Sequence, residues 1–140
     1  MDGTRILQVE DNPGDVELFA EALAAVDWDH QLDVVPDGAA ALRYLQRCAA
    51  AGPRALPGLI LLDLSLPGLS GREVLARIKA DPGLAAIPVI ITSGSDWDRD
   101  ILREFALPAP CYQVKPSTFS GYRDVATRIR TFLAEKVVHQ

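Results

Sequence analysis

The sequence predicts an α/β protein in which five parallel strands form one sheet covered by helices on both faces. Two observations carry this prediction. Short apolar segments alternate five times with segments whose apolar residues recur at helical spacing. The short segments are also apolar with few interruptions, which is typical of parallel strands buried on both faces. Together these features indicate a doubly wound fold.

The strands are expected where an apolar run ends in polar residues, prolines or glycines. Their predicted ranges are residues 5–9, 32–35, 58–64, 88–91 and 111–114. The third, GLILLDL, is the most apolar, and it carries a single carboxylate, Asp63, near its end. A carboxylate that closes so apolar a strand is unfavourable without polar partners.

The helices are expected between these strands, at residues 14–26, 38–50, 98–105 and 119–138, with a third helix marked by Val74, Leu75 and Ile78. Asn12 followed by Pro13 suits the N-cap and first turn of the first helix. Asp81-Pro82-Gly83 ends the third helix. The helix at 98–105 has the weakest apolar pattern of the five.

Composition excludes several classes of protein. With 140 residues, of which 49% are hydrophobic and 24% charged, the chain predicts one globular domain, residues 1–140, without an output domain. The formal net charge of −5 argues against nucleic-acid binding, and no apolar run approaches the ~20 residues of a membrane span. Two scattered cysteines predict neither a disulfide framework nor a zinc site and favour a cytoplasmic location.

Polar side chains follow four of the predicted strands. In chain order they are Glu10, Asp11, Asp63, Thr92, Ser93 and Lys115. Ligands of doubly wound sheets bind at the carboxyl ends of the strands. If the first and third strands are neighbours, these side chains converge in one cleft.

The chemistry of this group predicts phosphoryl transfer. Three carboxylates that lie close together repel one another unless a cation compensates, and Mg²⁺ prefers oxygen ligands. Asp63 then serves as a nucleophile that forms an aspartyl phosphate, while Ser93 and Lys115 neutralise the phosphoryl oxygens. Taken singly, each residue also has an ordinary role as a helix cap, a turn residue or a solvated charge.

The arrangement resembles the receiver domain of two-component response regulators over essentially the whole chain. The matching features are Glu10-Asp11, Asp63 within the pattern D-x-x-x-P-G-x-x-G, Ser93 followed by Gly94, and Lys115-Pro116. The resemblance implies the flavodoxin-like, CheY-like (βα)5 fold with strand order 2-1-3-4-5. It also implies a phosphoacceptor switch that receives its phosphoryl group from a sensor histidine kinase and catalyses only its own phosphorylation and dephosphorylation.

The resemblance also assigns roles to residues. Mg²⁺ is bound by Glu10, Asp11, Asp63 and the backbone carbonyl of Ser65. Ser93 bonds the phosphoryl group and acts as a switch with Tyr112, and Lys115 pairs with the phosphoryl group. More narrowly, the segment VEDNPGDVELFAEAL resembles stand-alone regulators that pair with phytochrome-type kinases.

Two departures from the family pattern and one peptide bond leave questions open. Thr92 competes with Ser93 as the switch hydroxyl, although Gly94 after Ser93 favours Ser93. Leu107-Pro108-Ala109-Pro110 replaces the usual Gly-Ala turn and stiffens the loop before the fifth strand. The bond between Lys115 and Pro116 is open to the cis form.

Other functions fit these residues less well than the switch. A pseudo-receiver that only binds proteins predicts loss of the acid pair or the lysine, and both are present. A phosphatase of this fold needs a second acid where Ser65 stands, and a flavin or nucleotide binder needs a glycine-rich phosphate loop. A histidine phosphotransfer protein remains an alternative partner. A homodimer would use the face of the fourth helix, fifth strand and fifth helix, or the apolar Leu133, Val137 and Val138.

Overall fold

The predicted sheet forms in the computed structural model, which describes residues 3–138 and the side chains up to residue 136. The strands are β1 (Thr4–Val9), β2 (His30–Val35), β3 (Leu59–Asp63), β4 (Val89–Ser93) and β5 (Tyr112–Val114). All neighbouring pairs are parallel, in the order β2-β1-β3-β4-β5. The fold class and the strand order predicted from the sequence are therefore confirmed.

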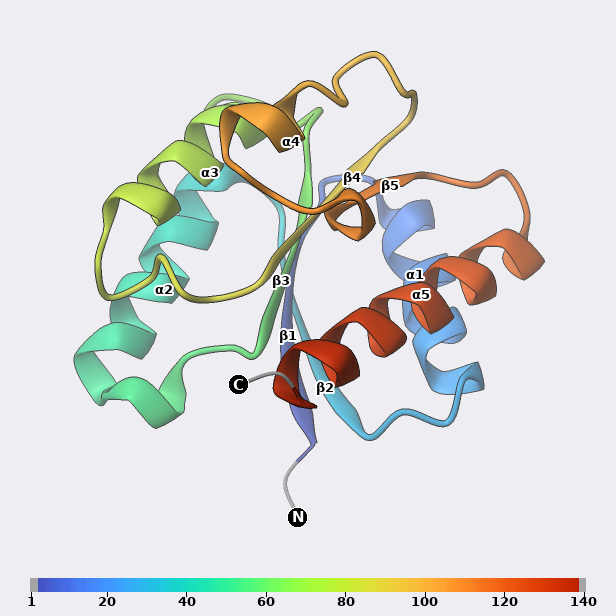
Figure 1. The fold of residues 1–140 in the computed structure, drawn as a ribbon, viewed down its shortest axis with the longest axis horizontal. Coiled ribbons are helices and arrows are strands. Elements are labelled where there is room, and N and C mark those ends of the chain that lie inside the picture. The colour runs from blue at the N-terminus through green and yellow to red at the C-terminus, as the bar shows by residue number, and fades with distance from the viewer. Residues whose placement is uncertain (1–2, 139–140) are drawn as a thin grey trace.

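Five helices cover the sheet. They are α1 (Pro13–Ala25), α2 (Gly38–Ala51), α3 (Gly71–Ala80), α4 (Ile101–Glu104) and α5 (Phe119–Val138), with short 3-10 turns at Pro53–Ala55 and Ala109–Cys111. Figure 1 shows α2, α3 and α4 on one side of the sheet and α1 and α5 on the other. In the described part of the chain, no helix is both long and apolar enough to cross a bilayer.

Each face of the sheet has its own core. Alternate residues of a strand point to opposite faces, so Ile60 and Leu62 pack under α2 and α3, whereas Leu59 and Leu61 pack under α1 and α5. Val125 and Ile129 of α5 are almost fully buried in the second core, and Phe132 packs against it partly buried.

The edge strand β2 departs from the predicted apolar pattern. It begins two residues earlier than expected, and its residues alternate between half-buried and exposed. Within the sheet β2 pairs with β1 alone, so its other edge is open to solvent. Near-continuous burial therefore holds for the central strands β3 and β4.

The predicted helix at residues 98–105 is the largest error in the expected elements. Only four residues, Ile101–Glu104, are helical. The segment before it is polar, and Ile101 is the only buried residue of the helix. At the other end, Ala106 has a positive φ of 53°, and Pro108 follows two residues later. Few apolar contacts are thus present to stabilise further turns.

Candidate functional site

The carboxyl ends of β1, β3, β4 and β5 meet at one edge of the sheet. Backbone hydrogen bonds fix the strand ends relative to one another. Glu10 N–H donates to the carbonyl of Val35 at 3.0 Å, and Lys115 N–H donates to the carbonyl of Ser93 at 2.7 Å. The predicted site residues therefore lie together, as the sequence suggested.

Three carboxylates form the acidic part of the site. Oxygens of Glu10, Asp11 and Asp63 all lie within 4.8 Å of one another. Glu10 and Asp63 are buried, whereas Asp11 is exposed. Three oxygen donors this close, with one side open to solvent, suit a hard divalent cation that keeps some of its waters.

Asp63 is held in place by the loop that follows β3. The backbone N–H of Ser65 donates to Asp63 Oδ1 at 3.1 Å. Gly71, the first residue of α3, packs so closely that a Cβ atom there would lie 2.5 Å from the carbonyl oxygen of Asp63. The glycine spacing seen in the sequence thus allows α3 to approach the end of β3.

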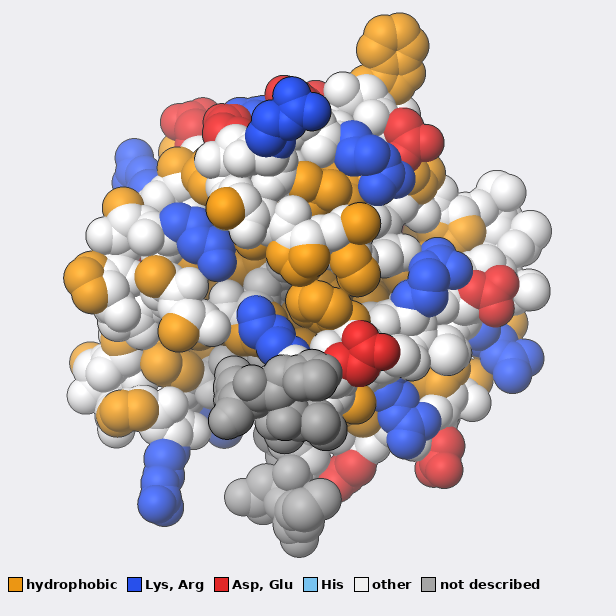
Figure 2. Space-filling model, viewed as in Figure 1, with side chains coloured by type: hydrophobic (Ala, Val, Ile, Leu, Met, Phe, Trp, Pro, Cys, Tyr) orange, Lys and Arg blue, Asp and Glu red, His pale blue; other side chains and the backbone are white. Residues whose placement is uncertain are grey.

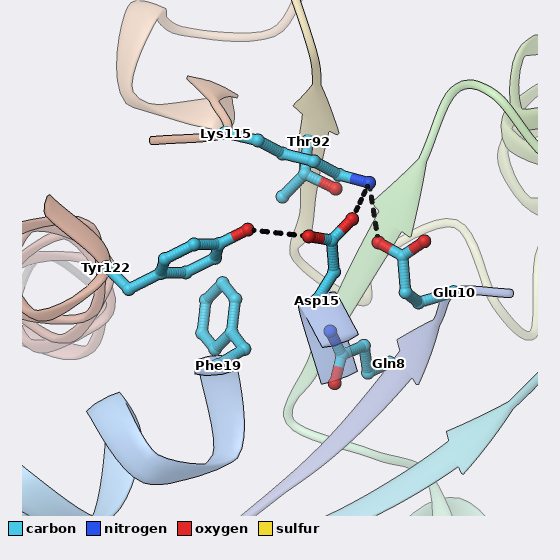
Figure 3. Close-up of a pocket in the computed structure, with 7 residues that line it drawn as sticks. All are labelled: Gln8, Glu10, Asp15, Phe19, Thr92, Lys115 and Tyr122. Atoms are coloured by element: carbon cyan, nitrogen blue, oxygen red, sulfur yellow. Dashed lines mark hydrogen bonds and ion pairs between the residues drawn. The ribbon is translucent and has the colours of Figure 1, made fainter. Parts of the chain in front are cut away.

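Lys115 brings a positive charge to these acids (Figure 3). Its Nζ lies 2.7 Å from Glu10 Oε1, 3.0 Å from Asp15 Oδ2 and 3.4 Å from Asp63 Oδ2. The described peptide bonds include no cis bond, so the bond from Lys115 to Pro116 is trans.

Burial and the neighbouring charges shift the pKa values of this pair upward. Burial, reinforced by the charge of Asp63, raises the pKa of Glu10 to about 7, although the bond to Lys115 opposes the rise. For Lys115, burial alone would lower the pKa, but the bonds to Glu10 and Asp15 outweigh it and hold the pKa above its ordinary value. The lysine is therefore a permanent cation of the site.

Asp15 and Tyr122 are site residues that the sequence analysis missed. Asp15 lies in the first turn of α1, which Asn12 caps as predicted by accepting from the N–H groups of Gly14 and Asp15. The hydroxyl of Tyr122, in α5, donates to Asp15 Oδ1 at 3.0 Å. Asp15 follows Asp11 by four residues, and that spacing was the available signal.

The two candidate hydroxyls at the end of β4 occupy opposite faces of the sheet. Ser93 is buried, and its Oγ accepts from the N–H of Ser95 at 3.3 Å. Thr92 lines a small cavity on the other face, together with Glu10, Asp15 and Lys115 of the site and with Phe19 and Tyr122 (Figure 3). Because successive strand residues point in opposite directions, Ser93 shares its face with Tyr112, which pairs with Ile91 in the ladder.

Tyr112 is buried in the core of that face, and its hydroxyl donates to the carbonyl of Ser95 at 2.6 Å. The guanidinium of Arg99 lies 4.8 Å from the centre of the same ring. Both contacts are with the loop between β4 and α4. The orientation of Tyr112 is therefore coupled to the loop that follows Ser93.

Comparisons with known proteins agree with this geometry. The family model of the response regulator receiver domain matches residues 6–126. Response regulator Rcp1 of Synechocystis sp. is 38% identical over 132 residues, which make up 94% of this chain and 90% of Rcp1.

Two solved structures also match closely. The phosphorylated cyanobacterial phytochrome response regulator RcpA has a TM-score of 0.80 and 39% identity, covering 96% of each chain. The Mn²⁺-bound form of Rcp1 has a TM-score of 0.77 and 37% identity, covering 92% of this chain and 93% of Rcp1. The match covers both the fold and the strand ends that build the site, and the chain therefore belongs to the response regulator receiver domain family of two-component signalling.

Proposed function

We propose that this receiver domain is a switch phosphorylated on Asp63 by a sensor histidine kinase. The observation that carries the proposal is the placement of the Asp63 carboxylate, buried at the end of β3, between two further acids and the ammonium of Lys115. A buried carboxylate in such surroundings is suited to accept a phosphoryl group, because cations neutralise the charge that the group brings.

Mg²⁺ fits this site. Glu10, Asp11 and Asp63 would hold it, together with the backbone carbonyl of Ser65, which follows the phosphoacceptor by two residues. The donor set consists of oxygens, which Mg²⁺ prefers. When bound, the ion supplies positive charge that offsets both the repulsion among the acids and the charge of the phosphoryl group.

In the transfer, the ionised carboxylate of Asp63 is the nucleophile. One of its oxygens attacks phosphorus, the bond from phosphorus to the kinase histidine breaks, and that histidine nitrogen keeps the electron pair and takes a proton. Dephosphorylation ends the signal. Water attacks phosphorus, the bond between phosphorus and the Asp63 oxygen breaks, and inorganic phosphate leaves the restored carboxylate. The domain thus catalyses only its own phosphorylation and dephosphorylation, and substrate turnover is not its function.

Ser93 and Tyr112 are proposed to convert phosphorylation into a change of surface. Ser93 would bond the phosphoryl group and thereby leave its contact with Ser95 N–H. The carbonyl of Ser95 is the acceptor of the Tyr112 hydroxyl, so movement of this loop changes the environment of the tyrosine. The shared face of Ser93 and Tyr112 supports Ser93 over Thr92 as the switch hydroxyl.

A phytochrome-type kinase is the proposed partner, and the cytoplasm the proposed location. Support comes from RcpA, whose solved structure is described as a cyanobacterial phytochrome response regulator. Transfer to a histidine phosphotransfer protein is a further proposed route. The action of residues 1–140 as a single receiver domain stays a prediction.

A homodimer is proposed on the face of α4, β5 and α5. Figure 2 shows apolar side chains gathered in the middle of this view. A cavity of about 400 Å³ lies beside this face, lined by apolar residues that include Phe105, Leu107 and Phe132 and by the lysines Lys79 and Lys136. The side chains of Val137 and Val138, also predicted for this contact, lie outside the described ones. Light scattering, with and without phosphorylation, would show whether the mass doubles.

The phosphorylation is tested by intact-mass measurement after incubation with Mg²⁺ and acetyl phosphate. We expect one phosphoryl adduct that requires Mg²⁺ and is absent from the Asp63→Asn variant, which should keep the native circular dichroism spectrum. An adduct of normal yield on Asp63→Asn would overturn the assignment of the phosphoacceptor. If the wild-type protein forms no adduct with acetyl phosphate or with any of a panel of histidine kinases, the pseudo-receiver is favoured.

A further inference from the structure

We propose that Asp15 and Tyr122 are positioning residues that hold the ammonium of Lys115 beside Asp63 before and during phosphoryl transfer. The proposal rests on the proposed function, because it concerns the same phosphoacceptor site. Three elements meet in this contact: Asp15 comes from α1, Lys115 from the end of β5 and Tyr122 from α5 (Figure 3).

Both oxygens of the Asp15 carboxylate are engaged. Oδ2 lies 3.0 Å from Lys115 Nζ, and Oδ1 accepts the Tyr122 hydroxyl at 3.0 Å. A carboxylate held at both oxygens has little freedom to rotate. Asp15 therefore presents its lysine-facing oxygen at a fixed position.

The other two acceptors of Lys115 belong to the acidic cluster, and Asp15 does not. Glu10 and Asp63 share that cluster with Asp11, where a divalent cation would compete with the lysine for their oxygens. Asp63 would also carry the phosphoryl group. Asp15 is then the carboxylate that stays available to Lys115 throughout, because it is committed to neither the cation nor the phosphoryl group.

Tyr122, which bonds Asp15, is itself held in place by packing. Tyr122 is only 3% exposed, and the ring of Phe19 packs edge-on against it with centroids 5.9 Å apart. Burial and the bond to Asp15 raise the pKa of Tyr122 to about 12, so its hydroxyl remains a donor at physiological pH. The cavity between these residues is about 10 Å³, which leaves no room for anything larger than a water molecule.

A purely structural role for Asp15 makes a different prediction. An acid in the first turn of a helix interacts favourably with the helix dipole, and its loss would weaken α1 whether or not Lys115 is present. If Asp15 acts by positioning Lys115, the effect of Asp15→Asn on phosphorylation must disappear once the lysine is removed. A double-mutant cycle separates the two roles.

The first test uses nitrogen-15 NMR of the lysine ammonium groups in the protein without phosphodonor. The chain has only three lysines, Lys79, Lys115 and Lys136, so the Lys115→Ala variant assigns the signal. We expect the Lys115 ammonium to exchange slowly with solvent in the wild type and to lose this protection in Asp15→Asn. Glu17→Gln, which removes an exposed carboxylate of the same helix, is the matched control and should keep the signal.

The second test measures the rate of phosphorylation by acetyl phosphate at saturating Mg²⁺. We expect Asp15→Asn to slow it about tenfold and Tyr122→Phe about threefold, with Glu17→Gln unchanged. Lys115→Ala should be slower still, and adding Asp15→Asn to it should change the rate no further. Thermal melts identify any variant that is not folded.

The outcomes separate this proposal from the proposed function. If the wild type forms no adduct, the phosphoacceptor function fails, and the NMR measurement alone decides the positioning of Lys115. If the wild type is phosphorylated but Asp15→Asn matches its rate, or slows Lys115→Ala by the same factor, the positioning role is overturned. A protected Lys115 signal in Asp15→Asn overturns it independently of phosphorylation.

Discussion

The Tyr112 hydroxyl donates a hydrogen bond to the backbone carbonyl of Ser95, two residues beyond the end of β4, at 2.6 Å. The tyrosine is buried, and the bond fastens the loop that follows Ser93 to β5. Tyr112, the proposed switch residue, is therefore joined directly to the loop that follows the proposed switch hydroxyl.

Tyr112→Phe should lower the free energy of unfolding by about 1 kcal/mol, because the carbonyl of half-buried Ser95 loses its side-chain donor. Urea denaturation measures the loss. Tyr44→Phe is the control, since the Tyr44 hydroxyl also donates, to Asp33 at 2.6 Å, but at an exposed position. Equal losses in the two variants would show that the bond of Tyr112 has no special stabilising role.

Lys115→Ala should destabilise the metal-free protein by about 2 kcal/mol or more, because buried Glu10 and Asp63 lose their cation. Mg²⁺ should recover part of this loss, since it supplies the missing positive charge. Urea denaturation in EDTA and in excess Mg²⁺ measures both effects. A loss that is the same in the two solutions would argue that lysine and metal do not act on the same acids.

Gly71→Ala should displace Asp63, because the new methyl group would lie 2.5 Å from the Asp63 carbonyl oxygen and 2.7 Å from Leu64 Cα. We expect a loss of about 2 kcal/mol in stability and slower phosphorylation by acetyl phosphate. Gly68→Ala is the control: Gly68 has a φ of 70° but open space around it, so it should lose about 1 kcal/mol. Its phosphorylation rate should fall less than that of Gly71→Ala.

The titration of Tyr122 predicts a stability change at high pH. Its ordinary pKa of 10.0 is raised to about 12 in the folded protein, so the folded state holds its phenol proton where the unfolded state releases it. The free energy of unfolding should therefore fall as the pH rises from 10 to 12. In Tyr122→Phe the fall should be smaller. Urea denaturation across this range checks it, and identical pH slopes in the two proteins would contradict the shifted pKa.

Much of the fold and the site could be predicted from the sequence because they depend on local patterns. Apolar runs identified the strands, and polar residues after each run identified the strand ends. Once those ends meet, Glu10, Asp63 and Lys115 necessarily lie together. The role of each residue in phosphoryl transfer stays a prediction.

Other features depend on packing that no local pattern encodes. The partnership of Asp15 with Lys115 spans 100 residues and requires the rotation of α1 about its axis. The shortness of α4 follows from the polar segment before it and from the positive φ of Ala106 after it, neither of which the apolar spacing in the sequence reveals. Thr92 and Ser93 are adjacent in the sequence and are distinguished only by the face of the sheet to which each side chain points. That direction follows from the register of β4.

The pairing of Asp15 with Lys115 also bears on how the protein is made. Translation delivers Glu10, Asp15 and Asp63 long before Lys115, and β1 and its two sheet neighbours, β2 and β3, are synthesised before β5. A nascent chain at that stage can bring its acids together without the lysine that offsets their repulsion. Synthesis of the fifth strand is therefore the step that brings the lysine needed to complete the charge balance of the site.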